Sequence, residues 1–322
     1  MLSDKIFTNY VSSPYSFKET ISWFKRFIVG PDMKNEGNVN YLPRSYSLNN
    51  ITPKYTISFI GDIMDMSSRD LIIDGSIKNF VRGSDFLIGN FEATLTAEKT
   101  AFMKKRHKPQ IMDALETLFR SKKTYLSTAN NHGGDFGQPF FIYSVSQLKE
   151  RGFNVFGNKE TPFQDLTDDL RVIGSTQWSN RPCDYLIKFE HSEQFLKEDS
   201  FNLLFPHWGY EMELYPRTTT INHGRTLLNE FDALIGHHSH CPQPVSFFSV
   251  DNVNKLIAYS LGNFCIGIEN KMHSYGIVMK VEIGKNWEDK WLIGKVDWAF
   301  IGSRFLNKQE FTVEIVENYD PN

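Results

Sequence analysis

Several widely separated segments of the sequence carry side chains of the metal-ligating type directly after an apolar run. These side chains are Asp62, Asn90, Glu92, Asn130, Asn131, His132, His207, His237, His238 and His240. Carboxylate oxygens and imidazole nitrogens together suit Mn²⁺, Fe or Zn²⁺, and a carboxylate such as Glu92 can bridge two ions. The pattern therefore predicts a site for one or two divalent metal ions.

The grouping of these residues carries the prediction, because each one alone is weak evidence. A single aspartate after a strand is usually a helix cap, and a single histidine is usually a hydrogen-bonded polar residue. Five of the nine histidines, however, lie in three short motifs. The three cysteines, Cys183, Cys241 and Cys265, are far apart, so they predict neither a disulfide framework nor a closed structural zinc site. This cysteine usage favours a reducing compartment.

The elements that would position the candidate ligands are short apolar runs that recur from Tyr55 onward. The runs are TISFIGD, DFLIGNFE, TYLSTANNH, FNLLFPHWG, DALIGHHSH and KLIAYSLGNF. Amphipathic stretches between them predict helices over 109–123 and 139–152, each with a proline in its first turn. This alternation is typical of an α/β fold. Because the carboxyl ends of parallel strands lie at one edge of a sheet, we expect the candidate ligands to converge there.

The last part of the chain is rich in predicted strands. After Gly276 it contains the runs GIVMKVEI, WLIGKVDWAFI and FTVEIV, which we expect to be antiparallel additions to the same sheet system. No linker is long enough to force a domain split. We therefore expect one main domain over 53–322 and an N-terminal extension over 1–52.

The extension contains one amphipathic helix, in the segment FKETISWFKRFI. Its apolar face holds Phe17, Ile21, Phe24 and Ile28. We expect this face to pack on the main domain. Contact with a partner or a membrane surface is the alternative, because the aromatic residues are flanked by Lys18, Lys25 and Arg26.

Composition places the chain among ordinary globular proteins. It has 322 residues, of which 40% are hydrophobic and 23% charged, and a formal charge of −3. This near-neutral charge argues against nucleic-acid binding through phosphate neutralisation. The sequence shows no run of about 18 apolar residues and no secretory signal, so we expect no membrane span and a cytoplasmic location. Docking at the inner membrane face through the N-terminal helix is the alternative.

Six motifs together resemble the signature segments of a known family. GDIM, GNFEATLT, ANNHGGDFG, PHWGYE, GHHSHCPQPV and YSLGNF are similar, in this order, to segments of the bacterial CapA family. These capsule and poly-γ-glutamate synthesis proteins are related to the calcineurin-like metallophosphoesterases. The resemblance runs from about Ile57 to Phe264. It implies a four-layer α/β/β/α sandwich of the metallophosphoesterase type, with a metal centre at one edge of the paired sheets.

The resemblance also implies roles for individual residues. Glu92 would bridge two cations. The other ligands would divide between these cations, with Asp62 and His240 on one and Asn131, His207 and His238 on the other. Catalysis would rest on Asp62, Glu92 and His132, through a water whose pKa the cations lower and which attacks phosphorus in line. His132 would orient a phosphoryl oxygen or protonate the leaving group.

Further residues are predicted to contact substrate or to orient the ligands. They are Asn90, Asn130, Glu211, His237 and Asn263. Glu211 as a solvated carboxylate and Asn263 as a turn cap are the alternatives. The usual phosphatase motif Asp-x-His is replaced here by Asp62-Ile63-Met64, and GNFE carries asparagine and glutamate in place of an aspartate. A single-metal site is therefore an alternative to a two-metal site.

The first functional hypothesis is a metal-dependent phosphoesterase-like hydrolase in capsular or extracellular polysaccharide biosynthesis. Its substrate would be a phosphorylated sugar, glycan or nucleotide-linked intermediate, and the capsule synthesis machinery would be its partner. The basic run 104–108 would bind an anionic substrate or form a solvated surface. A second hypothesis is a non-catalytic scaffold subunit of a capsule or polyglutamate synthesis complex. A third is metal-dependent hydrolysis of the amide bonds of a γ-linked glutamate polymer.

Overall fold

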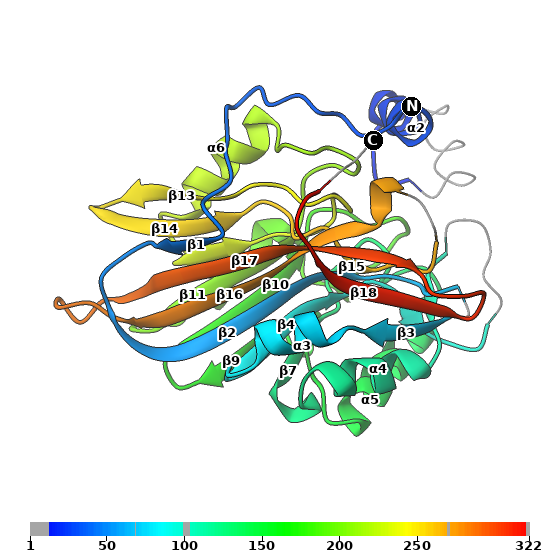
Figure 1. The fold of residues 1–322 in the computed structure, drawn as a ribbon, viewed down its shortest axis with the longest axis horizontal. Coiled ribbons are helices and arrows are strands. Elements are labelled where there is room, and N and C mark those ends of the chain that lie inside the picture. Colours follow the sequence, from blue (N-terminus) through cyan, green and yellow to red (C-terminus); the bar gives the residue numbers. More distant parts are fainter. Residues whose placement is uncertain (1–12, 68, 99–103, 269–270, 320–322) are drawn as a thin grey trace.

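The architecture consists of two β-sheets that pack face to face, with helices on their outer faces (Figure 1). The computed structural model describes residues 13–67, 69–98, 104–268 and 271–319. Within this part of the chain one sheet has ten strands and the other has six. A separate two-stranded sheet pairs β5 (Thr94–Leu95) with β6 (Arg106–His107).

The ten-stranded sheet combines parallel and antiparallel strands. Its main order is β3 (Asp70–Ile73), β18 (Glu310–Val316), β17 (Trp291–Phe305), β16 (Tyr275–Lys285), β2 (Thr52–Ile63), β4 (Phe86–Phe91), β7 (Thr124–Ser127) and β8 (Asn154–Phe156). In addition, β1 (Ser45–Ser47) pairs with β17, and β15 (Asn263–Cys265) pairs with β2. β2, β4, β7 and β8 are parallel. β16 and β18 pair antiparallel with β17, which confirms the prediction for the last part of the chain.

The six-stranded sheet supplies the second half of the sandwich. Its order is β13 (Val245–Val250), β14 (Val253–Ala258), β12 (Ala233–Ile235), β11 (Phe201–His207), β10 (Leu170–Thr176) and β9 (Phe163–Thr167). The four inner strands β14, β12, β11 and β10 are parallel, so their carboxyl ends share one edge. Short β12 is buried along its whole length, as expected for a central parallel strand.

Helices complete the outer layers. α3 (Gly75–Val81), α4 (Gln110–Leu118) and α5 (Gln138–Glu150) lie on one side of the molecule, and α6 (Thr218–Leu227) lies on the other (Figure 1). Leu115 and Leu148 share a core with Leu126 of β7, whereas Ile221 and Leu227 share one with strands of the second sheet. Between the sheets Phe59 stacks on Phe205 with ring centroids 6.3 Å apart. This confirms the predicted four-layer α/β/β/α sandwich.

The two predicted helices differ in how well their bounds agree with the structure. α5 begins with a proline in its first turn, as expected, and is followed by Gly152 at φ +89°. α4 is shorter than the predicted range 109–123. Pro109 is its N-cap, Phe119 is extended, and Ser121–Lys123 form a 3₁₀ turn. The helix ends here because the polar run after Phe119 offers few apolar side chains to bury. Two further 3₁₀ segments cover Phe189–Phe195 and Lys271–His273.

The N-terminal helix α2 (Phe17–Val29) forms where the sequence predicts it, and Ser16 caps its first turn. The prediction that its apolar face packs on the main domain is wrong. Phe17, Ile21, Phe24 and Ile28 are 58%, 55%, 44% and 78% exposed. The helix instead contacts the domain through its opposite face, where Thr20 and Arg26 are buried. Charge pairing with the 211–217 segment fixes this orientation.

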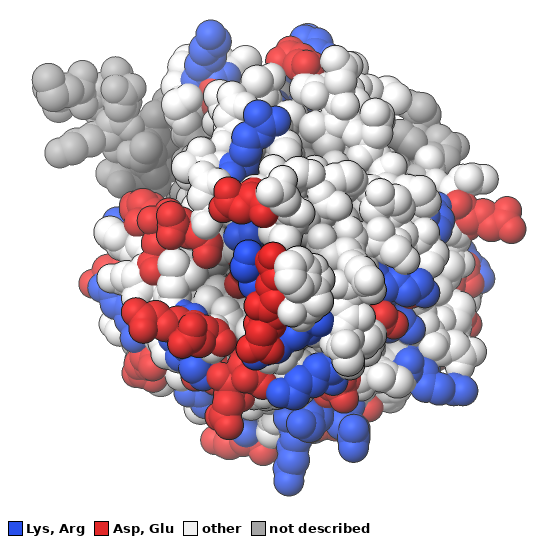
Figure 2. All heavy atoms as spheres, turned by 90° about the vertical axis from the view of Figure 1, so that its left-hand side faces the viewer, with Lys and Arg blue, Asp and Glu red and all other residues white. Residues whose placement is uncertain are grey.

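The surface at the left-hand end of Figure 1 carries charged side chains of both signs. Figure 2 shows Lys and Arg side chains interspersed with Asp and Glu over this face. Among the described residues, no helix combines the length and the hydropathy that crossing a bilayer requires.

Candidate metal centre

The first sheet contributes two carboxylates and a polar loop to one end of the sandwich. Asp62 stands one residue before the end of β2, and the register pairs it with Asn90 near the end of β4. Glu92 directly follows β4, and the loop that holds Asn131 follows β7. Gly61 permits the close approach that seats Asp62, because a Cβ at this position would lie 1.9 Å from the Gly262 carbonyl oxygen.

The second sheet contributes four histidines at the same end. His207 is the last residue of β11, and its backbone bridges to His237, two residues beyond β12. His238 and His240 follow in a buried loop and have positive φ angles of 107° and 56°. Such backbone costs about 1–3 kcal/mol for a non-glycine residue and persists where the surrounding structure enforces it. The loop is therefore held in a strained conformation that points to function.

One group of candidate ligands joins the two sheets through Asp62. The ligand atoms of Asp62, Glu92 and His240 lie within 4.8 Å of one another. His240 Nδ1 is 3.4 Å from Asp62 Oδ2, and its Nε2 is 3.7 Å from Glu92 Oε1. Asn263 Oδ1 is 3.0 Å from the same Nδ1 atom and so helps to orient the ring. This group contains the ligands predicted for one cation.

A second group shares Glu92 with the first. The ligand atoms of Glu92, His207 and His238 also lie within 4.8 Å of one another. His207 Nε2 is 3.5 Å from Glu92 Oε1 and 2.9 Å from Asn131 Oδ1. The residues predicted to hold the other cation are therefore brought together, with Glu92 between the two groups.

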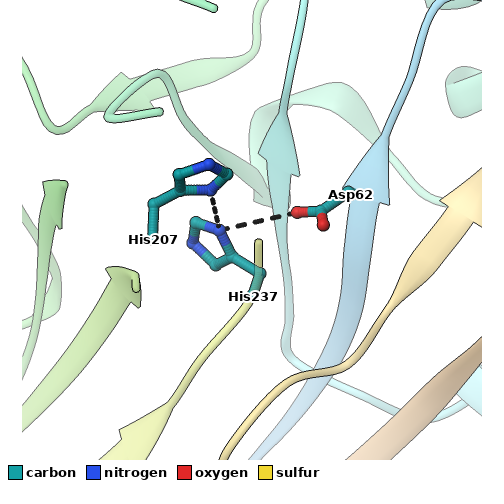
Figure 3. Close-up of side chains that lie close together, drawn as sticks. All are labelled: Asp62, His207 and His237. Atoms are coloured by element: carbon teal, nitrogen blue, oxygen red, sulfur yellow. Dashed lines mark hydrogen bonds and ion pairs between the residues drawn. The ribbon is translucent and has the colours of Figure 1, made fainter. Parts of the chain in front are cut away.

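His237 lies between the two sheets, where sequence reasoning left open whether it binds a metal or orients a ligand. Figure 3 shows its ring between His207 and Asp62. His237 Nδ1 is 2.7 Å from His207 Nδ1 and 3.5 Å from Asp62 Oδ1. His207 and His237 are fully buried, so the contact between their Nδ1 atoms fixes the orientation of the His207 ring. Asp62, His207 and His237 form a further group of potential ligands.

The pKa values of the two carboxylates shift in opposite directions, although both side chains are fully buried. Burial favours the protonated form of Asp62, but the hydrogen bond to His240 and the charge of His237 outweigh it and lower the pKa to about 2. At Glu92 the opposing charge is that of Lys105, and it is outweighed. The burial of Glu92, reinforced by the charge of Asp62, raises its pKa well above the usual value. A cation between the two carboxylates would remove this conflict, because it favours the ionised form of both.

The histidines are mostly held in the form that binds metals. Burial, reinforced by the neighbouring imidazoles, lowers the pKa of His207 and His238 well below the usual value. It also lowers the pKa of His237 to about 4. His240 is the exception, because its hydrogen bond to Asp62 outweighs burial and raises its pKa. Neutral imidazole is the ligand form, so no deprotonation opposes metal binding at His207 and His238.

Unpartnered atoms test whether these residues fit a metal ion. Within the described chain, Glu92 Oε1, His237 Nε2 and His238 Nδ1 are buried and have no hydrogen-bond partner. A buried polar atom without a partner costs about 1–3 kcal/mol, more when it is charged. A divalent cation would satisfy the carboxylate oxygen and the imidazole nitrogen of the second group. The nitrogen and oxygen donors fit Mn²⁺, Fe or Zn²⁺ and do not distinguish them.

His132 lies beside the ligands and has a partner that sequence reasoning missed. Its Nδ1 is 2.7 Å from Asp135 Oδ2, which orients the ring. His132, Asn131 and His240 line a cavity of about 330 Å³ together with Lys105 and Glu211. The signal for Asp135 was its place three residues after His132 in the HGGD loop.

The residues predicted to contact substrate divide into two sets. Glu211 lines the cavity. Asn90, Asn130, His237 and Asn263 are at most 1% exposed and do not line it. Asn90 Nδ2 donates to Asp62 Oδ1 at 2.8 Å, and Asn130 Nδ2 donates to Asn90 Oδ1 at 3.2 Å. These amides therefore support the ligands.

The basic run and the cysteines lie outside the ligand groups. His107 of the run is buried, with Nε2 3.0 Å from the Ile63 carbonyl oxygen, so it contacts the last residue of β2. Cys241 and Cys265 are free and buried, and burial raises the pKa of each thiol to about 12. They remain protonated at neutral pH and are inert rather than reactive.

The fold and the centre define a class: a four-layer sandwich with buried carboxylates and imidazoles where its two sheets meet. The sequence profile described as bacterial capsule synthesis protein PGA_cap matches residues 56–167 and 190–267, more than half of the chain. The chain belongs to this family. The two ligand groups that share Glu92 lie entirely within the matched segments, whereas α2 lies outside them.

Two curated relatives have names that concern the same process. One is the PGA biosynthesis protein CapA of Bacillus subtilis, which is 24% identical over 64% of this chain and 62% of its own. The other is the capsule biosynthesis protein CapA of Bacillus anthracis, 24% identical over 66% of this chain and 59% of its own. The chain thus spans about three fifths of the length of each.

One solved structure is also similar. It is a Staphylococcus aureus protein assigned as a 5′-nucleotidase, solved in complex with alpha-ketoglutarate, with 14% identity and a TM-score of 0.47. The match covers 76% of this chain and 53% of that protein.

Proposed function

We propose that the protein is a metal-dependent hydrolase of phosphoric esters that acts in the synthesis of a capsule or another extracellular polymer. The observation that supports this most is the pair of ligand groups that share Glu92 at the edge of the sandwich. Membership of the capsule synthesis family supports the process. The substrate class we propose is a phosphorylated sugar, glycan or nucleotide-linked intermediate.

The ligands would divide as the geometry groups them. Asp62 and His240 would hold one cation, His207, His238 and Asn131 the other, and Glu92 would contact both. When bound, divalent cations would lower the pKa of a water molecule and polarise a phosphoryl oxygen. Low exposure of Glu92 and His207 excludes bulk water, which strengthens every charge interaction at the reacting centre.

The cavity beside the ligands would receive the substrate. Its volume of about 330 Å³ is at the small end of the range for small-molecule sites. Lys105 places a positive charge on its wall, suited to a phosphoryl group. His132 Nδ1 is engaged by Asp135, which leaves Nε2 for a substrate oxygen or for protonating the leaving group.

The decisive experiment measures metal content and turnover in the same preparations. Wild-type protein is loaded with Mn²⁺ or Zn²⁺, dialysed, analysed by mass spectrometry, and assayed on sugar phosphates, nucleotides and a chromogenic phosphate ester. We expect bound metal and turnover, both lost in His207→Ala. His191→Ala is the matched control, because His191 is exposed and belongs to none of the ligand groups.

Other outcomes would favour other functions. Bound metal with cleavage of γ-linked polyglutamate and no ester cleavage would favour the amide hydrolase. Absence of bound metal after loading, with co-purification of a synthesis partner, would favour a scaffold subunit. The cytoplasmic location and the contact with the capsule machinery stay predictions.

A further inference from the structure

The N-terminal segment 13–29, here called the strap, lines the cavity beside the candidate centre. It lies outside the segments that match the family profile. Ser13, Tyr15 and Trp23 line the same cavity as Asn131 and His132. The Tyr15 ring stacks on Tyr210 with centroids 5.8 Å apart and meets Trp178 edge-on at 5.0 Å. Tyr15 is only 8% exposed, so the strap inserts this side chain into the protein.

The Tyr15 hydroxyl contacts a candidate ligand directly. Its oxygen lies 2.8 Å from His238 Nε2, and both groups are buried. The Glu211 backbone N–H donates to the same oxygen at 3.2 Å, and the Tyr15 O–H donates to Glu211 Oε1 at 3.4 Å. A phenol has one proton to donate and lone pairs to accept with. With its proton directed to Glu211, Tyr15 accepts from His238 Nε2–H.

This assignment fixes the state of the other ring nitrogen of His238. A neutral imidazole with its proton on Nε2 presents a bare lone pair at Nδ1. His238 Nδ1 is buried and has no partner within the described residues. Nδ1 is therefore the nitrogen that is ready to bind a cation beside Glu92 and His207.

The strap is fastened so that Tyr15 keeps this position. Trp23 Nε1 donates to Glu211 Oε2 at 2.6 Å, and Arg26 Nε donates to the Glu211 carbonyl oxygen at 2.9 Å. Arg26 also pairs with Glu213 at 3.2 Å. Glu211 is thus held by the strap at its side chain and at its backbone, and it in turn holds the Tyr15 hydroxyl.

We propose that Tyr15 is a positioning residue of the metal centre, which accepts the Nε2–H of His238 and so presents Nδ1 to the cation. The inference rests on the metal-binding part of the proposed function and not on the reaction. Groups that hydrogen-bond the distal nitrogen of a ligand histidine typically contribute 10- to 100-fold in metal affinity. Because coupling is reciprocal, metal binding also tightens the strap.

The test compares the affinity of the full chain for Mn²⁺ in three proteins by isothermal titration calorimetry. We expect Tyr15→Phe to bind about 10- to 100-fold more weakly than wild type. Tyr210→Phe is the matched control. It removes a hydroxyl from the ring stacked on Tyr15, and for that hydroxyl the described structure gives no hydrogen bond. Trp23→Phe, which loses one contact to Glu211, should lie between the two.

A spectroscopic readout separates positioning from general damage. The visible absorption spectrum of the Co²⁺-substituted protein reports ligand geometry, so it should change in Tyr15→Phe and not in Tyr210→Phe. Melting of the metal-free proteins in EDTA shows whether each variant folds. If Tyr15→Phe retains the wild-type affinity and Co²⁺ spectrum, the inference is overturned.

The outcomes also separate this inference from the proposed function. A wild-type protein that binds no Mn²⁺ or Co²⁺ overturns both. Metal binding that depends on Tyr15, without hydrolysis of any phosphoric ester, supports the inference and contradicts the proposed reaction. Hydrolysis of a phosphoric ester, with metal binding that does not depend on Tyr15, supports the proposed reaction and contradicts the inference.

Discussion

Two polar clusters of this molecule, one partly and one fully buried, are constructed differently. In the strap cluster, Glu19 and Glu213 alternate with Arg26 and Arg217, and each charge faces an opposite one. In the metal centre, Asp62 and Glu92 face imidazoles, and within the described residues no Lys or Arg forms an ion pair with either. The strap cluster is balanced by its own side chains, whereas an added cation would balance the carboxylates of the candidate metal centre.

Glu19 and Glu92 illustrate this difference through their pKa shifts, whereas burial raises the pKa of Glu213 despite its arginine partners. Burial opposes the ionisation of Glu19, but hydrogen bonds to Arg217 and Arg26 outweigh it and lower the pKa. At Glu92 burial and the charge of Asp62 outweigh the charge of Lys105 and raise the pKa. A buried carboxylate that no side chain neutralises indicates a site for a ligand of opposite charge.

The largest expected effect comes from breaking the self-balanced cluster. Arg26→Ala would leave buried Glu213 without one of its partners. Removing one partner of a buried ion pair costs about 3–5 kcal/mol. Hydrogen exchange of the α2 amides should show that the free energy of opening the strap falls by about this amount. Lys18→Ala, on the exposed face of the same helix, should leave the exchange rates unchanged.

Adding the missing cation should stabilise the centre by a comparable amount. At a free Mn²⁺ concentration 1,000 times the dissociation constant, the free energy of unfolding should rise by about 4 kcal/mol. Glu92→Gln removes the shared oxygen ligand and should abolish this rise in thermal melts with and without EDTA. Glu190→Gln, an exposed carboxylate changed in the same way, should retain it. An equal rise in both variants would contradict the assignment of Glu92.

The stability of the metal-free protein should depend on pH through Glu92. Its folded-state pKa lies above the unfolded value, so the folded state binds more protons. Stability contributed by the protonated group is therefore complete below the unfolded pKa and is lost as the pH rises through the folded pKa. Glu92→Gln should remove this loss and make the metal-free variant more stable than wild type at alkaline pH. Chemical denaturation across pH in EDTA measures the difference.

The smallest effect is expected on the outward face of α2. Ile28→Ser should change the free energy of unfolding by less than about 0.5 kcal/mol, because Ile28 is 78% exposed. Urea denaturation followed by circular dichroism gives the value. A loss of 2 kcal/mol or more would mean that this face is buried, as the sequence pattern first indicated.

Much of the centre was predictable because parallel strands end at one edge. Asp62 and Glu92 lie at the ends of neighbouring parallel strands of one sheet, and this position predicts that they converge. His207 ends a strand of the other sheet, so its approach to them depends on how the two sheets pack. The contact of Tyr15 with His238 was not predictable, because it joins residues more than 200 positions apart and Tyr15 follows no strand. The orientation of α2 was missed for a related reason. Periodicity identifies an apolar face, but the partners of Arg26 that turn this face outward lie in a distant loop.

The strained backbone at His238 also has a consequence for protein engineering. A redesign guided by stability alone would replace this residue by glycine, which adopts positive φ without strain. The same change would delete a candidate ligand and the partner of Tyr15. Thermostable variants selected without a metal-binding screen would therefore lose the candidate ligand His238 before the other ligands.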